Sequence, residues 1–183
     1  KTPTFDLAAT LDSGQVFRYK LTGGGATLIA GRHRAGFTAC EDGWKVECDD
    51  APFFKKYLDF DTNYDIIQLK TQDKGLVSSA IAFGRGIHIL RQDAAETIFS
   101  FLVSQNNHIP RIKGIIERIC DALGEDMGGY RAFPTIEALA GAGTEFFASV
   151  GAGYRAEYLS RTAERLAEED LDEWRALPTE ELR

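Results

Sequence analysis

The chain contains 183 residues, 44% of them hydrophobic, and has a formal net charge of −7 at pH 7. It holds no apolar run near the ~20 residues of a membrane span and no signal-peptide pattern at its start, so we expect neither secretion nor a membrane partner. Three cysteines without a CxxC pair are typical of a reducing compartment rather than of a disulfide framework.

The negative charge is distributed unevenly along the chain. From Glu164 to Arg183, eight acids and three bases give −5, which leaves −2 for all other residues. In contrast, Arg111, Lys113 and Arg118 form a locally positive stretch. Because phosphate binding depends on such local cations, the net charge does not exclude DNA as a partner.

The first third predicts a small antiparallel sheet. Four short runs rich in aromatic and β-branched residues are separated by turn clusters: QVFRYKL, ATLIAGR, GFTAC and WKVEC. A helix should follow, with Asp49 or Asp50 as its cap and Pro52 in its first turn. A further helical pattern covers residues 64–83 and should end near Gly84.

The second half predicts helices. Asp93 and Glu96 form a pair like a capping box, and the helix after it, which contains Phe99 and Phe101, is apolar on most faces, as a core helix is. Pro110 suits the first turn of the next helix, whose apolar residues fall on one stripe. These are Ile112, Ile115, Ile116, Ile119, Cys120 and Leu123.

Two more helices are expected in the segments FPTIEALAG and GYRAEYLSRTAERLAEE. In the second of these, Tyr154 and Tyr158 fall on the same side as Leu159 and Leu166, which is the expected apolar side of that helix. Near the end of the chain, Pro178 and Thr179 are typical of the start of another helix.

The segment SQNNHIPR, residues 104–111, places polar residues between two apolar helices. One interpretation is that Asn106 and Asn107 cap helix carbonyls and turn the chain, a common role of Asn. The other is that the amides bond base edges in DNA while Arg111 contacts a phosphate. The residues alone leave both interpretations open.

Two glycine-containing segments are also ambiguous. In GAGYRAEY, Tyr154 could stack on a base beside an in-plane bond from Arg155, or simply pack inward after a turn. In LDSGQVFRY, Gly14 could mark a bend, or let the backbone approach a ligand closely. No Walker loop, dinucleotide fingerprint or zinc spacing is present, so no metal site is expected.

Taken in order, four segments resemble the 8-oxoguanine DNA glycosylase/AP lyase family of the helix-hairpin-helix superfamily: LDSGQVFRY, HILRQDAAETIFSFLVSQNNHIPRIKGIIERIC, FPTIEAL and GAGYRAEYL. The resemblance implies an α+β fold. Residues 1–86 would form an N-terminal antiparallel β-sheet domain with flanking helices, and residues 87–183 an incomplete, all-helical helix-hairpin-helix glycosylase domain. The family's catalytic Lys and Asp are expected beyond Arg183, so no catalytic residue is assigned in this chain.

In that family a damaged guanine is flipped out of the duplex, and a lysine attacks the sugar C1′ to form a Schiff base. The resemblance implies that the Gly14 carbonyl accepts the extra N–H of 8-oxoguanine. Asn106 would fill the vacated space and bond the orphaned cytosine. Arg111 and Arg155 would bond that cytosine from its sides, and Tyr154 would wedge into the stack.

Asn107 belongs to the same expected DNA-contacting set. His108 stands where eukaryotic members often have another Asn, so the resemblance assigns no contact to it.

The expected function is DNA base excision repair, with removal of 8-oxoguanine opposite cytosine by N-glycosidic cleavage and AP-lyase strand cleavage in the intact protein. We expect no metal or organic cofactor, a monomer, and a double-stranded DNA partner that contains an oxidised guanine. The location would be the cytoplasm with the bacterial nucleoid, or the nucleus of a eukaryote. Two alternatives stay open: a glycosylase for alkylated bases, and a non-catalytic DNA-binding fragment or module.

Overall fold

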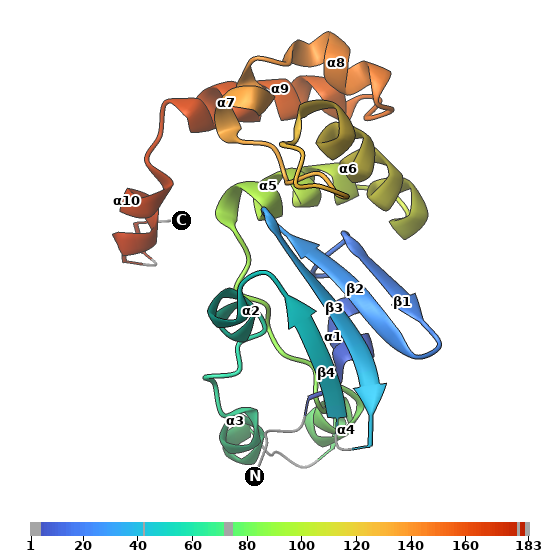
Figure 1. Cartoon of the computed structure of the whole chain (residues 1–183). Helices are drawn as coiled ribbons and strands as arrows, with labels where there is room; N and C mark the ends of the chain where they lie inside the picture. The colour runs from blue at the N-terminus through green and yellow to red at the C-terminus, as the bar shows by residue number, and fades with distance from the viewer. Residues whose placement is uncertain (1–4, 42, 72–74, 179, 182–183) are drawn as a thin grey trace. The chain divides into compact units, whose positions relative to one another are not determined.

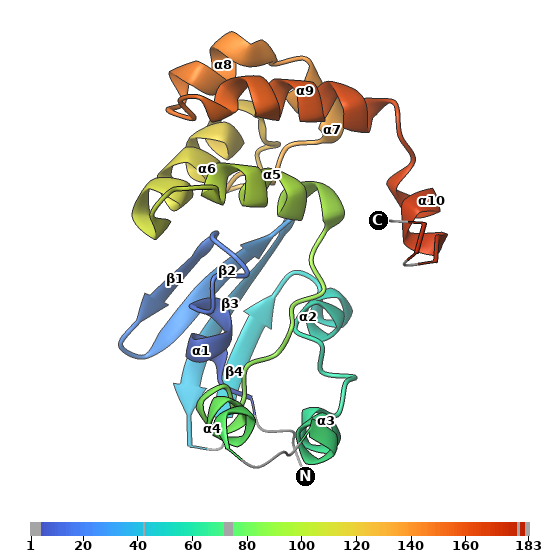
Figure 2. The same ribbon diagram turned by 180° about the vertical axis from the view of Figure 1, so that it is seen from behind.

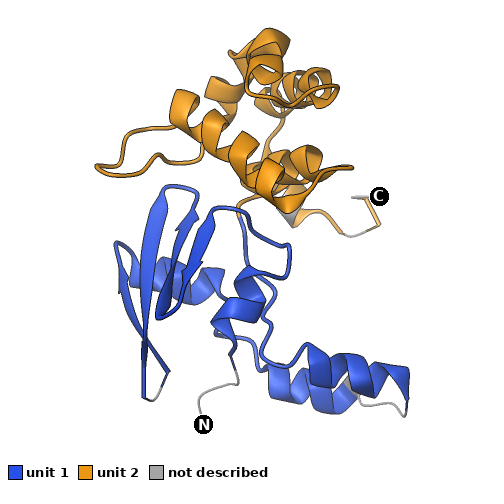
Figure 3. Ribbon diagram, turned by 90° about the vertical axis from the view of Figure 1, so that its right-hand side faces the viewer, with its two compact units in different colours: residues 1–92 blue, residues 93–183 orange. Residues whose placement is uncertain are grey.

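The computed structural model describes residues 5–41, 43–71, 75–178 and 180–181. The chain divides into two compact units, Lys1–Gln92 and Asp93–Arg183, which are coloured separately in Figure 3. The domain boundary expected from the sequence lies earlier, at Gly86. Residues 86–91 go with the first unit because the Asp6 N–H donates to the Gly86 carbonyl at 2.9 Å, and the Arg91 N–H to the Tyr57 carbonyl at 2.8 Å.

The first unit contains the predicted antiparallel sheet (Figure 1). Its strands lie in chain order: β1 (Tyr19–Thr22), β2 (Gly25–Ala30), β3 (His33–Cys40) and β4 (Gly43–Cys48). Alternate residues of β2 are buried, beginning with Ala26, and Phe37 of β3 lies between Ala26 and Val46 of the neighbouring strands. This alternation is what a sheet with one face on a core requires.

Two short helices accompany the sheet. Helix α1 (Leu7–Leu11) was not predicted, because five residues are too few to show a helical period. Figure 2 shows α1 against one face of the sheet, where Leu7 and Leu11 belong to the same buried cluster as Leu28. Helix α2 (Ala51–Tyr57) begins as predicted, since the Phe53 N–H donates to Asp50 Oδ1 at 2.9 Å.

The single helix predicted over residues 64–83 is wrong. The structure has α3 (Tyr64–Thr71) and α4 (Leu76–Phe83), and residues 72–74 lie outside the described part of the chain. Gly75, directly before α4, has a φ of +106°, which a right-handed helix cannot contain.

The second unit is helical. Its elements are α5 (Ala94–Ser104), α6 (Ile109–Leu123), α7 (Ile136–Ala140), α8 (Gly143–Ser149), α9 (Arg155–Ala167) and α10 (Leu171–Ala176). The views in Figures 1 and 2 show α9 alongside α7 and α8. Helices α8 and α10 were not predicted, whereas the Asp93 cap of α5 is confirmed by a 3.0 Å bond from the Glu96 N–H.

The apolar stripe of α6 is confirmed, with Ile112, Ile115, Ile116, Ile119 and Cys120 all buried. Helix α5 is not buried on most faces as a core helix would be, because the apolar Phe101 is 67% exposed. The apolar side expected for α9 is also only partly buried. Thr179 and Arg183 lie outside the described residues, so the helix expected after Pro178 is not described either.

Among the helices that the structure describes, none has the length and apolar character needed to cross a lipid bilayer.

Candidate nucleic-acid interface

The turn between α5 and α6 gives Asn106 an unusual backbone. Helix α5 ends at Ser104, and Asn106 adopts a φ of +47°, a left-handed conformation that Asn tolerates better than most residues. Its side chain is exposed, and its amide has no hydrogen-bond partner among the described residues. The turn therefore presents the Asn106 amide to solvent.

Asn107 behaves differently from its neighbour. Its Nδ2 donates to the Val103 carbonyl at 3.1 Å, and its Oδ1 accepts from the His108 N–H at 3.0 Å. His108 then caps α6 by accepting from the Arg111 N–H at 3.4 Å. The capping interpretation thus fits the Asn107 side chain. The expected contact of Asn107 with DNA would require its bonds to the Val103 carbonyl and the His108 N–H to break.

Arg155 fixes the same turn from beneath. It is only 3% exposed although it occupies the first position of α9. Its Nε donates to the Gln105 carbonyl at 2.8 Å, and its Nη2 donates to the carbonyls of Gln105 and Asn106, the latter at 2.9 Å. A guanidinium group is favourable here because these carbonyls lie at the negative end of the α5 dipole.

The buried face of α9 therefore differs from the apolar side expected from the sequence. Arg155 and Leu159 are buried, whereas Tyr154 is 59% and Tyr158 53% exposed. Helical periodicity placed the tyrosines inside because it treats an arginine as a surface residue. Arg155 can be buried because backbone carbonyls satisfy its donors.

Arg111 and Tyr154 complete a compact group with Asn106 and Arg155. Arg111 is exposed, and its Nη2 donates to the Gly151 carbonyl at 3.2 Å. The Tyr154 ring centroid lies 4.4 Å from Arg155 Cζ, a cation–π contact. An amide, a guanidinium group and an aromatic face thus come together at one corner, and these groups can bond a base edge or stack on a base.

The Gly14 loop belongs to the first unit. Gly14 has a φ of +86°, and its carbonyl has no hydrogen-bond donor among the described residues. The neighbouring Gln15 anchors the loop, since its Nε2 donates to the His88 carbonyl at 2.9 Å and its Oε1 accepts from the Leu90 N–H at 2.9 Å. The loop can thus offer a backbone carbonyl held by its neighbour. Sequence reasoning singled out Gly14 and overlooked Gln15.

Another polar contact lies beside this loop. The Tyr19 hydroxyl donates to Asp12 Oδ1 at 2.6 Å. Burial, together with this bond to a carboxylate, raises the pKa of Tyr19 above its ordinary value. The phenol therefore stays protonated and keeps its bond to the start of the loop.

Residues 88–91, which hold Gln15, are themselves fastened by Asp59. Its Oδ1 accepts from Arg91 Nε at 2.8 Å and its Oδ2 from the Tyr64 hydroxyl at 2.7 Å, while that hydroxyl accepts from the Ile89 N–H at 2.7 Å. Burial alone would raise the pKa of Asp59, but hydrogen bonds from Arg91, Tyr64 and Thr62 together outweigh it and hold the pKa below its ordinary value.

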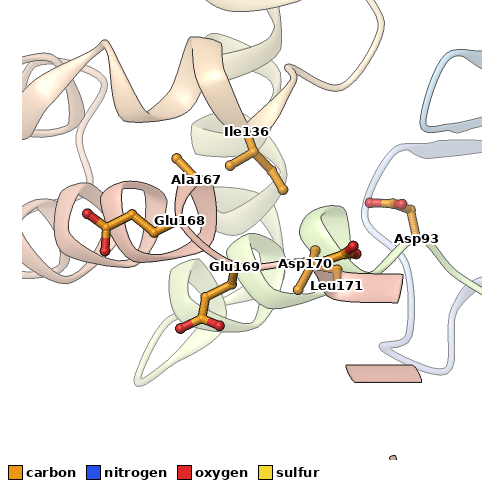
Figure 4. Close-up of a pocket in the computed structure, with 7 residues that line it drawn as sticks. All are labelled: Asp93, Ile136, Ala167, Glu168, Glu169, Asp170 and Leu171. Atoms are coloured by element: carbon orange, nitrogen blue, oxygen red, sulfur yellow. The ribbon is translucent and has the colours of Figure 1, made fainter. Parts of the chain in front are cut away.

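An acidic hollow lies at the far end of α9 from Arg155 (Figure 4). Its acids are Asp93, Glu168, Glu169 and Asp170. Figure 4 shows the Glu168 and Glu169 carboxylates pointing apart, and Asp93 caps α5. In the described part of the chain, no group of three or more His, Cys, Asp or Glu side chains could hold a metal ion. The hollow would repel phosphates, so the Arg155 end of α9 is the better place for DNA.

Comparisons with known proteins identify the family of this chain. A family model described as 8-oxoguanine DNA glycosylase, N-terminal domain, matches residues 1–98, just over half of the chain. The N-glycosylase/DNA lyase OGG1 of Arabidopsis thaliana is 30% identical over 178 residues, which cover 87% of this chain and 48% of that protein. This chain therefore spans about half of the length of that relative.

Two solved structures share the fold along nearly the whole chain. The structure of MBOgg1 in complex with a low-affinity DNA ligand has a TM-score of 0.90 and 32% identity, and the match covers 99% of this chain and 66% of that one. The Clostridium acetobutylicum 8-oxoguanine glycosylase/lyase, in complex with double-stranded DNA containing cytosine opposite 8-oxoguanine, has a TM-score of 0.88 and 31% identity, with 96% and 64% covered. With the family model, these matches show that this chain belongs to the 8-oxoguanine DNA glycosylase family.

Proposed function

We propose that this chain forms the DNA-recognition part of a bifunctional glycosylase and lyase that removes 8-oxoguanine opposite cytosine in base excision repair. The observation that carries the proposal is the Asn106 turn. Its amide is exposed and has no partner in the described part of the chain, its backbone is fixed by a buried arginine, and Arg111 and Tyr154 lie beside it. Such a fixed polar corner suits a base that has lost its pairing partner.

Each side chain has a proposed role at that base. Asn106 fills the space left by the flipped guanine and bonds the orphaned cytosine, and Tyr154 wedges into the stack. Arg111 bonds the cytosine from one side, which requires only the release of its exposed bond to the Gly151 carbonyl. Arg155 bonds the cytosine only if it exchanges carbonyl partners for the base.

Gly14 is proposed to read the lesion itself. The extra N–H of 8-oxoguanine needs an acceptor, and the Gly14 carbonyl is an acceptor without a donor in the described residues. Unmodified guanine has no hydrogen at that position, so it would not gain this bond.

The proposed partner is double-stranded DNA containing an oxidised guanine, bound by a monomer in the nucleoid or the nucleus. The Clostridium relative was solved with such a duplex. The chemistry that the family resemblance implies uses a lysine and an aspartate, for which no residue of this chain is proposed, and it requires neither a metal nor an organic cofactor.

Binding to matched duplexes tests the recognition part. Fluorescence anisotropy would compare duplexes containing 8-oxoguanine opposite cytosine, guanine opposite cytosine, 8-oxoguanine opposite adenine, and an alkylated adenine opposite thymine. We expect the first duplex to bind most tightly. Preference for the alkylated base would favour the glycosylase of alkylated bases instead.

Borohydride trapping tests the reaction. The protein expressed from the intact reading frame that encodes this chain should form a covalent adduct with the 8-oxoguanine duplex, because borohydride reduces a Schiff base to a stable bond. Tight binding without any adduct, under conditions where a known glycosylase/lyase gives one, would favour the non-catalytic DNA-binding alternative.

A further inference from the structure

Three arginines hold the turn that precedes Tyr154. This turn, residues 150–153, joins α8 to α9, and each of its first three carbonyls accepts a hydrogen bond from a different guanidinium group. The bonds are Arg118 Nε to Val150 O at 2.8 Å, Arg111 Nη2 to Gly151 O at 3.2 Å, and Arg155 Nη1 to Ala152 O at 3.3 Å.

Only one of these arginines has no proposed contact with DNA. Arg111 and Arg155 are both proposed to bond the orphaned cytosine. A guanidinium group that turns toward a base weakens or breaks its hydrogen bond to the backbone carbonyl. When both are engaged, Arg118 is the arginine left to hold the turn. Its bond is also the shortest of the three.

Two glycines lie close to the guanidinium group of the exposed Arg118. A Cβ atom at Gly114, on the same helix, would lie 3.2 Å from Arg118 Nη1, and one at Gly151 would lie 3.1 Å from Nη2. Both distances are tighter than ordinary van der Waals contacts, so the two glycines leave the space in which the guanidinium group lies. Gly151 also has a φ of +90°, which glycine adopts most readily.

We infer that Arg118 is a positioning residue, which fixes the 150–153 turn so that Tyr154 and Arg155 keep their places while Arg111 and Arg155 engage DNA. This inference rests on the proposed function. Arg118 acts through the turn and not on the base, so its loss should affect the choice of opposite base more than the affinity for DNA in general.

Two substitutions in the full chain separate geometry from charge. Arg118→Ala removes both, whereas Arg118→Lys keeps the charge but loses the planar group that fits between the glycines. Arg161→Ala serves as the control, because Arg161 is 73% exposed and, within the described ranges, forms an ion pair with Glu157 alone, at 3.4 Å. Hydrogen–deuterium exchange of the amides of residues 150–156, without DNA, would report on the turn. Anisotropy with 8-oxoguanine opposite cytosine or adenine would report on discrimination.

We expect both Arg118 variants to exchange these amides about fivefold faster, the factor for one hydrogen bond of typical strength. The preference for cytosine over adenine should fall by a similar factor in both variants and stay unchanged in Arg161→Ala. If Arg118→Lys retained the wild-type preference while Arg118→Ala lost affinity for all duplexes alike, Arg118 would be a phosphate contact and the inference would be wrong.

Unchanged exchange of the amides of residues 150–156 in the Arg118 variants would also contradict the inference. So would a lower melting temperature of these variants with their preference for cytosine intact. A failure of the proposed function would give a result that can be distinguished from a failure of this inference. The unsubstituted chain would then show no preference for the lesion duplex, which removes the DNA-directed part of the inference, while exchange would still show whether Arg118 holds the turn.

Discussion

The Gly14 loop and the Asn106 turn offer different groups to a ligand, and different chemistry holds each in place. The loop exposes a backbone carbonyl and is anchored by a neutral amide, that of Gln15. The turn exposes a side-chain amide and is anchored by the cationic Arg155. In each case the anchoring residue lies next to the residue that is proposed to read DNA. Gln15 follows Gly14 in the sequence, whereas Arg155 contacts Asn106 through the fold.

The two regions differ in whether one residue both anchors the backbone and is proposed to contact DNA. In the loop, Gln15 anchors the backbone and Gly14 is proposed to make the contact, so substitutions at Gln15 leave the proposed contacting group in place. At the turn, Arg155 is both the anchor and a proposed contact. Four substitutions test this distinction, given in order of their expected effect on the free energy of unfolding.

Arg155→Ala should have the largest effect, a loss of about 3 kcal/mol, because it leaves buried carbonyls without their charged donors. Urea unfolding measures it, with Arg161→Ala as the exposed control, which should stay within about 0.5 kcal/mol of wild type. Discrimination for cytosine opposite the lesion should also weaken. A fully stable Arg155→Ala protein would show that Arg155 does not anchor the turn.

Gln15→Ala should lower stability by about 2 kcal/mol, because the His88 carbonyl and the Leu90 N–H both lose their partner. Ser13→Ala is the matched control, since Ser13 Oγ also accepts from Gln15 Nε2 at 2.9 Å but is not part of the anchor to residues 88–91. Gln15→Ala should reduce the preference for 8-oxoguanine over guanine, and Ser13→Ala should not. Equal effects of the two substitutions would contradict the anchoring role.

Asp59→Asn should cost about 1 to 2 kcal/mol at neutral pH, since its carboxylate accepts charged hydrogen bonds but Arg91 is partly in solvent. Asn suits the φ of +54° at this position, so the backbone strain stays similar. Because folding lowers the pKa of Asp59, its contribution is present above the unfolded pKa, near 3.8, and is lost as the pH falls through the lower folded pKa.

The difference between the wild-type and Asp59→Asn proteins should therefore disappear at acidic pH, as urea unfolding at a series of pH values would show. A difference that persisted unchanged to the lowest accessible pH would assign it to packing.

Asn106→Gly should have the smallest effect on stability, within about 0.5 kcal/mol, because glycine accepts a φ of +47°. It should nevertheless cost about 1 to 3 kcal/mol in binding the lesion duplex, the typical value of a good base contact. Asn106→Ala should lose the same contact and also about 1 kcal/mol of stability, because Ala tolerates the left-handed backbone conformation less well than Asn does. Normal lesion binding by Asn106→Gly would restore a purely structural role for Asn106.

The sequence predicted most of what depends on local pattern. Runs of aromatic and β-branched residues between turn clusters indicated the four strands, and the caps at Asp50, one of two candidates, and Asp93 are confirmed. Short helices such as α1 were missed because they hold too few residues for a period, and the break before α4 was missed because a left-handed glycine leaves little trace in hydrophobicity.

The family resemblance named the candidate site residues, but their internal contacts could not be predicted. The resemblance named Asn106, Asn107 and Arg155 together, yet only the fold shows that Asn107 caps α5, whereas the Asn106 amide has no hydrogen-bond partner among the described residues. The burial of Arg155 depends on carbonyls about fifty positions away, which no local pattern encodes. Arg118 could have been noticed as the arginine two helical turns after Arg111 on α6.

The three carbonyls of residues 150–152 also bear on the entropy of association. A free arginine side chain samples many rotamers, and confining it costs on the order of 2 kcal/mol. Here the guanidinium groups are already confined by backbone oxygens before any nucleic acid arrives. The carbonyls thus hold the three guanidinium groups close to the proposed site, so part of their ordering cost is incurred when the protein folds, and DNA has to supply bonds that replace those released by Arg111 and Arg155.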